Sequence, residues 1–383
     1  MKLLHIADLH IGKRVNEFNM IEDQKYILEK ILQIIDEEKT DGVLVAGDVY
    51  DKSLPSAEAV ELLDEFLTRL TEREQSVFMI SGNHDSPERL GFGSKILQKN
   101  KLHIAGLFDG TLQKVSMQDE YGTINIFLLP FLKPAMVKPF FEQPIETYED
   151  AVRAILSTTE LNEQERHLLV AHQFVIHGIQ QPECSDSETL SIGGLDHVES
   201  AVFDGFDYVA LGHLHGPQRM GRDTVRYAGS PLKYSFSESR HQKSVVLIEV
   251  KSKGVVEYRL LPLSPKRDLR EIKGPIEELL RVGRENTACS DDYIHATLTD
   301  EDEIYDAIGQ IRQVYPNLMV LDFENSRSRK VMDSQTSASG DVARKSPLDL
   351  FSDFYQLQNN NELSPEQLQV MKQIFEQVGG DSV

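Results

Sequence analysis

The sequence predicts a layered α/β protein that carries a small α/β cap and ends in a pair of helices. Three observations indicate this architecture. Short apolar runs alternate with amphipathic helical patterns over residues 1–265, a shorter α/β pattern covers 266–324, and two helical stripes lie in 347–383. Between the last two, the Ser-rich stretch 325–346 has no apolar periodicity and predicts a flexible linker. The length of 383 residues favours more than one domain.

The apolar runs predict the strands of the first domain. Several are continuous runs of Val, Ile, Leu and Phe, which is typical of strands buried on both faces. We expect strands at 2–7, 42–46, 76–81, 124–129, 167–171, 207–211, 244–250 and 255–261.

Two amphipathic helices are expected among the first strands. Residues 20–38 carry an apolar stripe of Ile27, Ile31, Ile34 and Ile35. Residues 55–73, with Pro55 suited to the first turn, carry a second stripe of Val60, Leu63, Phe66, Leu67 and Leu70.

The cap and the tail are predicted from shorter signals. The cap has the order β-α-β-α-β, with strands at 267–273, 293–298 and 318–323 and helices from Pro275 and over 301–314. In the tail, Leu348, Phe351 and Tyr355 form one stripe, and Ser364 and Gln367 have the spacing of a capping box. Two short helices cannot form their own core, so we expect them to dock on another protein rather than on this chain.

Composition excludes several classes of protein. No apolar run approaches the roughly 20 residues that cross a bilayer, and the N-terminal residues lack the apolar core of a signal peptide, so a cytoplasmic protein without membrane segments is expected. The two cysteines, Cys184 and Cys289, match no disulfide framework or zinc spacing. Acidic residues outnumber basic ones by 62 to 40, and the net charge of −22 argues against nucleic-acid binding by bulk electrostatics, though not against a local basic or metal-charged site.

Potential metal ligands follow five of the predicted strands. Ligands of open α/β sheets bind beyond the carboxyl ends of the strands, so these side chains should meet in one crevice. They are Asp8, His10, Asp48, Asn83, His172, His213 and His215. Seven oxygen and nitrogen donors are too many for one catalytic ion and suit two divalent ions that share a carboxylate, the usual device for displacement at phosphorus. A ligand set without thiolates favours manganese, iron or zinc over calcium.

Two further polar residues lie in the same loops. His84 follows Asn83 and is a candidate to protonate a departing oxygen, and Asp51 could hold its tautomer. Any one of these residues alone is a weak signal, since a single histidine is more often an ordinary core or surface residue. The ordered set, with each member at the end of an apolar run, is much more specific for a metal centre.

The same ordered set resembles the calcineurin-like metallophosphoesterase superfamily over about residues 1–265. Within it, the segments Leu4–Gly12 and Tyr227–Pro231 resemble the bacterial SbcD nuclease family, which is related to double-strand-break repair nucleases. The resemblance implies a sandwich of two central β-sheets flanked by helices. It also implies that Asp8, His10, Asp48 and His215 hold one ion, that Asp48, Asn83, His172 and His213 hold the other, and that His84 is catalytic with Asp51 in support.

The resemblance further implies a manganese-dependent DNA nuclease with 3′→5′ exonuclease activity on duplex ends and endonuclease activity at hairpins and single strands. Such enzymes act in DNA repair, recombination and replication, as a homodimer within a heterotetramer with the coiled-coil ATPase SbcC. Residues 347–378 would then clamp the coiled coil of the partner, and the cap would help to hold DNA.

Alternatives remain at this stage. A phosphatase or a cyclic-nucleotide phosphodiesterase of the same superfamily has the same ligand set, although neither needs the cap and the tail. A non-enzymatic metal-binding scaffold is a second alternative, against which the complete site argues. Local basic surface would have to supply contacts to DNA, and the candidates are Lys13, Arg14, Lys52, Arg89, Arg219, Arg222 and Arg226.

Overall fold

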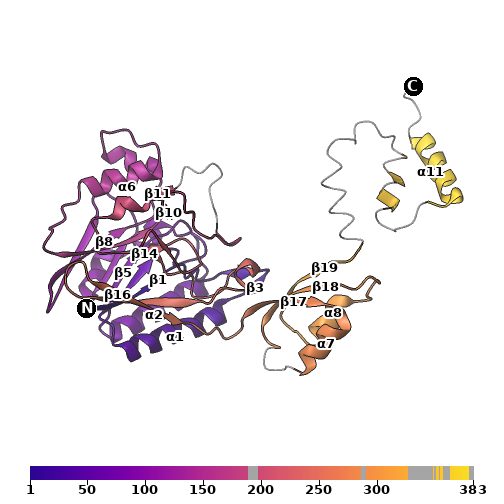
Figure 1. The fold of residues 1–383 in the computed structure, drawn as a ribbon, viewed down its shortest axis with the longest axis horizontal. Coiled ribbons are helices and arrows are strands. Elements are labelled where there is room, and N and C mark those ends of the chain that lie inside the picture. The colour runs from indigo at the N-terminus through magenta and orange to yellow at the C-terminus, as the bar shows by residue number, and fades with distance from the viewer. Residues whose placement is uncertain are drawn as a thin grey trace. The chain divides into compact units, whose positions relative to one another are not determined.

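The computed structural model describes residues 1–188, 197–285, 290–326, 348, 351–352, 354–356 and 363–378. The chain divides into two compact units, Met1–Leu269 and Arg270–Val383 (Figure 1). Cys289 and nearly all of the predicted linker 325–346 lie outside the described residues.

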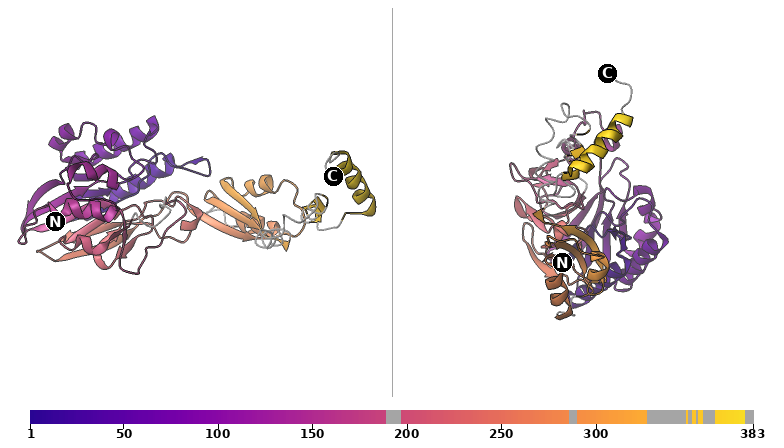
Figure 2. Two further views of the ribbon diagram at one scale, coloured as in Figure 1. Left: turned by 90° about the horizontal axis from the view of Figure 1, so that it is seen from above. Right: turned by 90° about the vertical axis from the view of Figure 1, so that its right-hand side faces the viewer.

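The first sheet of the N-terminal unit has six strands, with parallel pairing through its centre. The order is β16 (Val256–Pro262), β15 (Ser244–Val250), β1 (Lys2–Ile6), β4 (Gly42–Ala46), β5 (Ser76–Ile80) and β6 (Leu102–Ala105). Strands β1, β4, β5 and β6 are parallel neighbours, whereas β15 and β16 are antiparallel. The long helices α1 (Ile21–Glu38) and α2 (Ala57–Glu72) lie together along this sheet (Figure 2).

The second sheet also has six strands. Its order is β13 (Gln218–Met220), β14 (Arg222–Tyr227), β12 (Tyr208–Gly212), β9 (Arg166–His172), β8 (Gly122–Leu129) and β7 (Gln113–Asp119). Strands β8, β9, β12 and β14 run parallel. Helices α5 (Pro134–Val137) and α6 (Tyr148–Ser157) pack on its outer face through a core that includes Val137, Val152 and Ile155.

The two sheets pack face to face around one buried core. Leu44 and Phe78 of the first sheet belong to the same cluster as Ile126, Val170 and Tyr208 of the second, and all are fully buried. The strands are therefore apolar on both faces, because one face meets the other sheet and the opposite face meets helices. The predicted sandwich of two sheets flanked by helices is confirmed.

Short elements connect the two sheets. They are β2 (Arg14–Val15), β3 (Phe18–Asn19), β10 (Phe174–Ile176), β11 (His197–Glu199), α3 (Pro87–Leu90), α4 (Ser94–Leu97), and the 3₁₀ helices Gln98–Asn100, Lys138–Phe140, Ser200–Phe203 and Phe236–Glu238.

The second unit contains the predicted β-α-β-α-β order. Its three-stranded sheet is β17 (Leu269–Gly274), β18 (Tyr293–Leu298) and β19 (Leu318–Phe323), with β18 in the centre, and its helices are α7 (Ile276–Glu285) and α8 (Ala307–Arg312). Helix α11 (Pro365–Val378) follows later, and its start has the predicted reciprocal cap between Ser364 and Gln367. Among the described residues, no helix combines the length and the apolarity of a membrane crossing.

Several details of the sequence prediction were wrong. Val60 is 45 % exposed, and Leu62 is buried with Leu63 on α2 instead. Pro55 precedes the helix, because Ser56 is the N-cap and accepts from the Ala59 amide. In the second unit the helix expected over 301–314 begins only at Ala307, where the Asp306 side chain caps it.

The strands that the sequence did not predict are mostly short or half-exposed. Strand β7 lies at the edge of its sheet and alternates between half-buried and exposed side chains, most of them polar. A strand of this kind has no continuous apolar run, so its signal is weak.

Candidate metal centre

The predicted ligands come from the carboxyl ends of neighbouring parallel strands. Asp8 and His10 follow β1, Asp48 follows β4, and Asn83 follows β5. His172 is the last residue of β9, and His213 and His215 follow β12 in the other sheet. Because the carboxyl ends of β1, β4 and β5 meet those of β9 and β12, the two sheets bring all seven side chains to one place.

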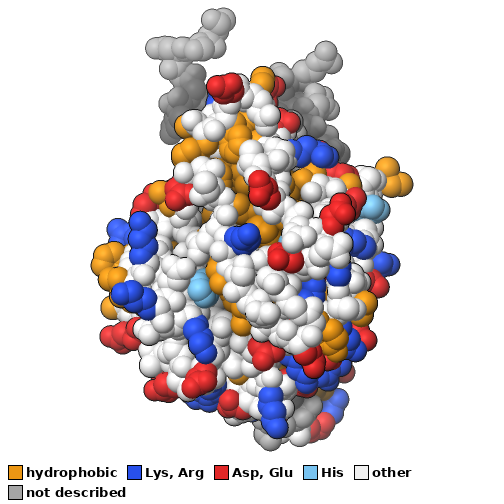
Figure 3. All heavy atoms as spheres, turned by 90° about the vertical axis from the view of Figure 1, so that its left-hand side faces the viewer, with side chains coloured by type: hydrophobic (Ala, Val, Ile, Leu, Met, Phe, Trp, Pro, Cys, Tyr) orange, Lys and Arg blue, Asp and Glu red, His pale blue; other side chains and the backbone are white. Residues whose placement is uncertain are grey.

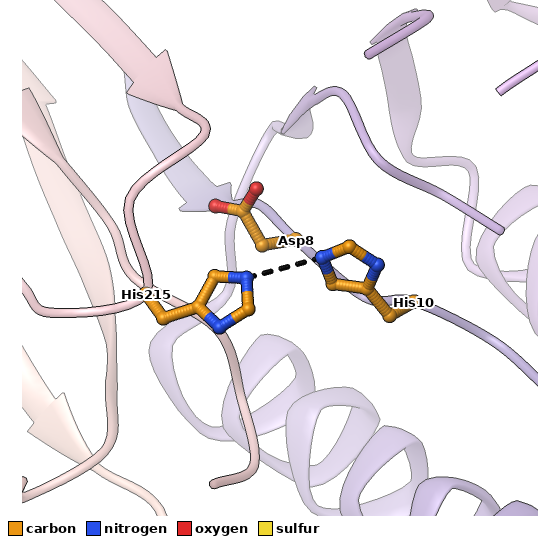
Figure 4. A group of neighbouring side chains, drawn as sticks. All are labelled: Asp8, His10 and His215. Carbon is orange, nitrogen blue, oxygen red and sulfur yellow. Dashed lines mark hydrogen bonds between the residues drawn. The ribbon is translucent and has the colours of Figure 1, made fainter. Parts of the chain in front are cut away.

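One half of the cluster consists of Asp8, His10 and His215 (Figure 4). The Nε2 atoms of His10 and His215 point toward each other and lie 3.1 Å apart. One ligand atom of each residue lies within 4.8 Å of those of the other two. The Asp8 carboxylate accepts a hydrogen bond from the His213 amide at 2.9 Å, which ties this half to the other.

The other half is centred on Asn83. Its Oδ1 atom lies 2.9 Å from Nε2 of His172 and 3.0 Å from Nδ1 of His213. Asp48 lies between the halves, because its Oδ2 atom is 3.3 Å from His172 Nε2 and 3.7 Å from His10 Nε2. This is the position that a carboxylate shared by two ions would occupy.

The donor set fits a cation. His172 Nδ1 donates to the Ala46 carbonyl at 2.8 Å, so a neutral ring presents the lone pair of Nε2 to the oxygens of Asn83 and Asp48. Three acceptors that converge on one buried point repel one another unless a proton or a metal ion lies between them. His10 adds a further nitrogen, since its Nε2 lies 3.1 Å from Nε2 of His215 and 3.7 Å from Oδ2 of Asp48.

The pKa values of these side chains also reflect the electrostatic repulsion within the cluster. Burial raises the pKa of Asp8 well above its ordinary value, with the neighbouring Asp48 carboxylate acting in the same direction. Burial would lower the pKa of His172, but the charges of Asp48 and Asp8 raise it to about 9. Burial lowers the pKa of His213 to about 3. Without a bound cation, each buried charge in the cluster is therefore stabilised only by an opposite charge close to it.

His84 lies beside this cluster with its ring fixed. Its amide donates to Asp48 Oδ1 at 2.8 Å, and its Nδ1 donates to the backbone carbonyl of Asp51 at 2.9 Å. The sequence had suggested that the side chain of Asp51 makes this contact, and this prediction was wrong. The Asp51 carboxylate instead accepts a hydrogen bond from Lys13 at 2.8 Å. The tautomer of His84 is thus set by main chain, which leaves Nε2 for another partner.

The ligand loops require unusual backbone. Asp8, His10, Asp48 and His213 have φ values of 52°, 44°, 48° and 108°, a region that side chains other than glycine disfavour by about 1–3 kcal/mol each. A Cβ atom at Gly82 would overlap the Asp48 carboxylate, and one at Gly212 would overlap the Ala46 carbonyl. The glycines that precede Asn83 and His213 therefore permit the close approach of the ligand loops.

The sequence did not identify Glu238 and Lys243, which support His215. Glu238 is fully buried; its Oε1 lies 3.3 Å from His215 Nδ1 and accepts from Ser187 at 2.5 Å. Lys243 pairs with Oε2 of Glu238 at 2.5 Å and donates to the His215 carbonyl at 2.8 Å. Charged residues in a predicted loop look like solvated surface, so no sequence signal distinguished them.

Asp85 is a second supporting residue to which sequence analysis assigned no role. Its carboxylate accepts from the amides of Val49, Tyr50 and Gly82 at 2.9–3.0 Å, which joins the loops that carry Asp48 and Asn83. Burial and the Asp48 charge raise its pKa to about 6 in spite of these hydrogen bonds. Its place beside His84 in the sequence was the only available signal.

Only some of the predicted DNA-contacting residues have free surface. Arg222 donates to the carbonyls of Phe203 and Phe206, and the buried Arg226 stacks on the Tyr258 ring, so both support the fold. Arg14, Lys52, Arg89 and Arg219 are exposed, and Lys13 is half-buried. Figure 3 shows basic and acidic side chains interspersed over one face of the N-terminal unit rather than gathered into a patch.

Comparison with known proteins gives a consistent result. Residues 1–217 match the family of the calcineurin-like phosphoesterases, and residues 265–359 match the type 5 capsule protein repressor C-terminal domain. The SbcD subunit of the SbcCD nuclease of Staphylococcus epidermidis is 33 % identical over 381 residues, which are 98 % of each chain.

Solved structures with a similar chain path share little sequence. A dimetal phosphatase from Danio rerio is 12 % identical with a TM-score of 0.38 and covers 69 % of this chain and 99 % of its own. A protein of Thermus thermophilus is 11 % identical with a TM-score of 0.38 and covers 68 % and 98 %. The full-length relative and the match of the catalytic domain establish the family: this chain belongs to the calcineurin-like phosphoesterases and, within them, to the SbcD family of SbcCD nuclease subunits.

Proposed function

We propose that this chain is a metal-dependent DNA nuclease, the phosphodiester-cleaving subunit of an SbcCD complex. The observation that carries the proposal is the convergence of seven donors at the strand ends of a chain that matches such a nuclease subunit over 98 % of its length. We propose duplex ends, hairpins and single strands as its substrates, with 3′→5′ exonuclease activity on duplex ends. The work of such an enzyme on chromosomal DNA in repair, recombination and replication is consistent with a cytoplasmic location.

Two divalent ions, most favourably manganese, would bind in the two halves of the cluster. Asp8, His10, Asp48 and His215 would hold one, and Asp48, Asn83, His172 and His213 the other. When bound, such ions act as Lewis acids on a phosphate and lower the pKa of water. Imidazole and carboxylate ligands without sulfur suit manganese. The ions also explain how an acidic protein attracts a phosphodiester, since their four positive charges exceed the two negative charges of Asp8 and Asp48.

His84 is the proposed acid for the leaving oxygen. Its Nδ1 is engaged by the Asp51 carbonyl, so Nε2 is the atom that can carry a proton toward substrate. The rings of His84 and His10 are perpendicular with centroids 4.8 Å apart, and this closeness supports a role for His84 beside the proposed ligands. The variant His84→Ala should therefore still bind two manganese ions per chain in a calorimetric titration while it loses most turnover. Loss of an ion would instead make His84 a ligand.

A comparison of substrates tests the function itself. The protein with manganese should cleave a DNA hairpin, and it should hydrolyse a simple phosphomonoester poorly. The opposite preference would favour a phosphatase, and turnover of a cyclic nucleotide alone would favour a phosphodiesterase. The second unit and the tail favour the nuclease, because an enzyme for small substrates needs neither.

The C-terminal segment 347–383 is proposed to bind the coiled-coil ATPase SbcC. Phe354, Val370 and Ile374 are 57 %, 53 % and 43 % exposed in this segment, so apolar surface is available for a partner helix. Capture of SbcC by the full chain and by a chain that ends at residue 346 would test this. Equal capture by both would place the docking surface elsewhere.

We also propose that the chain is a homodimer within the complex. Phe92 and Ile96, on adjoining short segments after the His84 loop, are 85 % and 73 % exposed. Large exposed apolar side chains that lie close together often mark an interface between proteins. Sedimentation of the parent and of Phe92→Ser/Ile96→Ser would test this: the parent should be a dimer and the variant a monomer.

A further inference from the structure

A cavity of about 420 Å³ lies between the loop that follows His10 and the loop that follows Asp48 in the N-terminal unit. Its wall includes Asp51, whose carbonyl holds His84. A group bound in the cavity can therefore contact Asp51, the residue that holds the proposed catalytic acid His84. Ligand sites in proteins commonly have volumes of about 300–1,000 Å³, so the cavity is large enough for a mononucleotide.

Two loops form the cavity, and backbone contacts join them. The loop after His10 contributes Ile11 and Arg14, and the loop after Asp48 contributes Lys52 and Leu54. The amide of Asp51 donates to the Ile11 carbonyl at 3.2 Å, and Ile11 forms a parallel bridge with Tyr50. The cavity is thus held by the same loops that hold the ligands, and its position relative to them is fixed.

The chemistry of the wall suits one nucleotide of a DNA strand. Ile21 and Leu54 offer apolar surface to a base or a sugar, and the Asn19 amide offers a polar edge, while the buried Ile11 backs the wall. Arg14 and Lys52 offer two positive charges to a backbone phosphate; in the described residues neither has a carboxylate in ion-pair range. Arg14 donates instead to the Glu17 carbonyl, which keeps its charge available.

The acidic residues of the wall do not cancel this charge. Asp51 is neutralised by Lys13 at 2.8 Å, and Glu58 is the remaining carboxylate. Two cations against one uncompensated anion leave the cavity positive inside a protein whose net charge is −22. This local positive charge is what the composition required of any contact with nucleic acid.

We propose that this cavity binds the nucleotide that neighbours the scissile phosphate, with Arg14 and Lys52 on a backbone phosphate and Leu54 against the base or sugar. The proposal rests on the nuclease function proposed above. Apolar packing and phosphate contacts carry little base identity, so the site binds nucleotides of any sequence.

The test compares two phosphodiesters in the full chain with manganese. Bis(p-nitrophenyl) phosphate can reach the metal centre without a neighbouring nucleotide, whereas a short single-stranded oligonucleotide presents one. The variant Arg14→Gln/Lys52→Gln should retain kcat/KM for the small diester within about twofold and lose about tenfold or more for the oligonucleotide, mainly in KM. The slope of log(kcat/KM) against log salt should become shallower by about 1.4, about 0.7 for each lost phosphate contact.

Two further variants sharpen the result. Leu54→Glu adds a negative charge at a residue that is 68 % exposed and should repeat the selective loss for the oligonucleotide. The control Lys39→Gln/Lys114→Gln also removes two exposed positive charges, and Lys39 lies directly after the C-terminal end of α1. This control should leave kcat/KM for both substrates and the salt slope unchanged.

Three results would overturn the proposal. The first is an oligonucleotide kcat/KM in Arg14→Gln/Lys52→Gln equal to that of the parent. The second is an equal loss for both substrates, which would place the two residues in the metal centre. The third is a parent protein that hydrolyses the small diester but cleaves no DNA; this would reject the nuclease function too, and the parent alone reveals it.

Discussion

The substitution Glu238→Gln tests how the protein holds one half of its metal centre. Gln keeps the shape of Glu238 and one side-chain oxygen, but it removes the negative charge that pairs with the Lys243 ammonium group. Glu238 Oε1 lies 3.3 Å from His215 Nδ1, and Oε2 lies 2.5 Å from Lys243 Nζ. Carboxylates in this position fix the orientation of a ligand histidine, and their loss typically weakens metal binding by about 10–100-fold.

The expected loss of stability follows from burial. Glu238 and Lys243 are 0 % and 4 % exposed, and breaking a buried pair on one side costs about 3–5 kcal/mol. Lys243 keeps two neutral acceptors, the His215 carbonyl and Ser230 Oγ, both at 2.8 Å. Burial lowers the pKa of Lys243, and loss of the Glu238 charge, which raises this pKa, would lower it further. We therefore expect the lower end of this range, about 3 kcal/mol.

Two measurements separate the local effect from the global one. Urea unfolding in the presence of a chelator gives the change in the free energy of unfolding without metal. Titration of the folded protein with manganese at low denaturant should resolve two binding steps. One step should weaken by about 10–100-fold, which is about 1.4–2.8 kcal/mol, and the other should be unchanged.

A matched control is Asp119→Asn, which breaks the ion pair between Asp119 and the buried Arg166. This pair involves none of the predicted ligands, so the control should lose stability and keep both metal-binding steps. The reasoning is refuted if Glu238→Gln weakens both steps equally, because the residue would then act only through the fold. It is also refuted if both steps keep their affinity, because His215 would then not depend on Glu238.

Three other predictions concern the backbone, pH and the tail. In Gly82→Ala the new Cβ would displace the Asp48 carboxylate, so the number of bound manganese ions and the rate of DNA cleavage should both fall. The control Gly122→Ala, at a turn with open space, should lower the free energy of unfolding by about 1 kcal/mol and keep activity. Normal manganese stoichiometry in Gly82→Ala would contradict this. Burial raises the pKa of Asp119, but hydrogen bonds from Arg166, the Tyr121 amide and the N-terminal ammonium together hold it well below the ordinary value. Its stabilising effect is therefore complete above about pH 5 and is lost as the pH falls further. Urea midpoints between pH 7 and pH 3 should fall less in Asp119→Asn than in the parent, and parallel curves would reject the assignment. Removal of residues 347–383 should abolish capture of SbcC and leave hydrolysis of a small diester unchanged, while a loss of hydrolysis would show that the tail supports the catalytic unit.

The sequence predicted the centre of the fold better than its edges. Strands such as β4 and β5 are buried on both faces, so their apolar runs match the structure within a residue. Strand β7 packs on one side only and shows an alternation of weak contrast. On α2, the apolar pattern alone could not decide between Val60 and Leu62, since both fit a helical stripe and only tertiary packing distinguishes them.

The sequence predicted the candidate ligands for a related reason. A polar residue directly after a buried strand has a known location, because the end of the strand fixes it. Glu238 ends a short 3₁₀ helix and Lys243 directly precedes β15, and what positions their side chains is a network of contacts with His215, Ser187 and Ser230. Contacts between distant segments leave no periodic trace in the sequence, so residues of this kind emerge only with the structure.

The strained ligand loops suggest how the fold and the metal centre depend on each other. Four ligands adopt positive φ, at about 1–3 kcal/mol each, and their side chains bring like partial charges together inside a low-dielectric core. The two rigid sheets impose this arrangement, because Asp8, Asp48 and His213 continue directly from strands that are locked in the sandwich. A ligand that binds only the folded state stabilises it by a free energy that grows with the logarithm of its affinity and concentration. The sandwich therefore carries the strain in advance, and cations bound between the converging donors would relieve the repulsion that the fold creates.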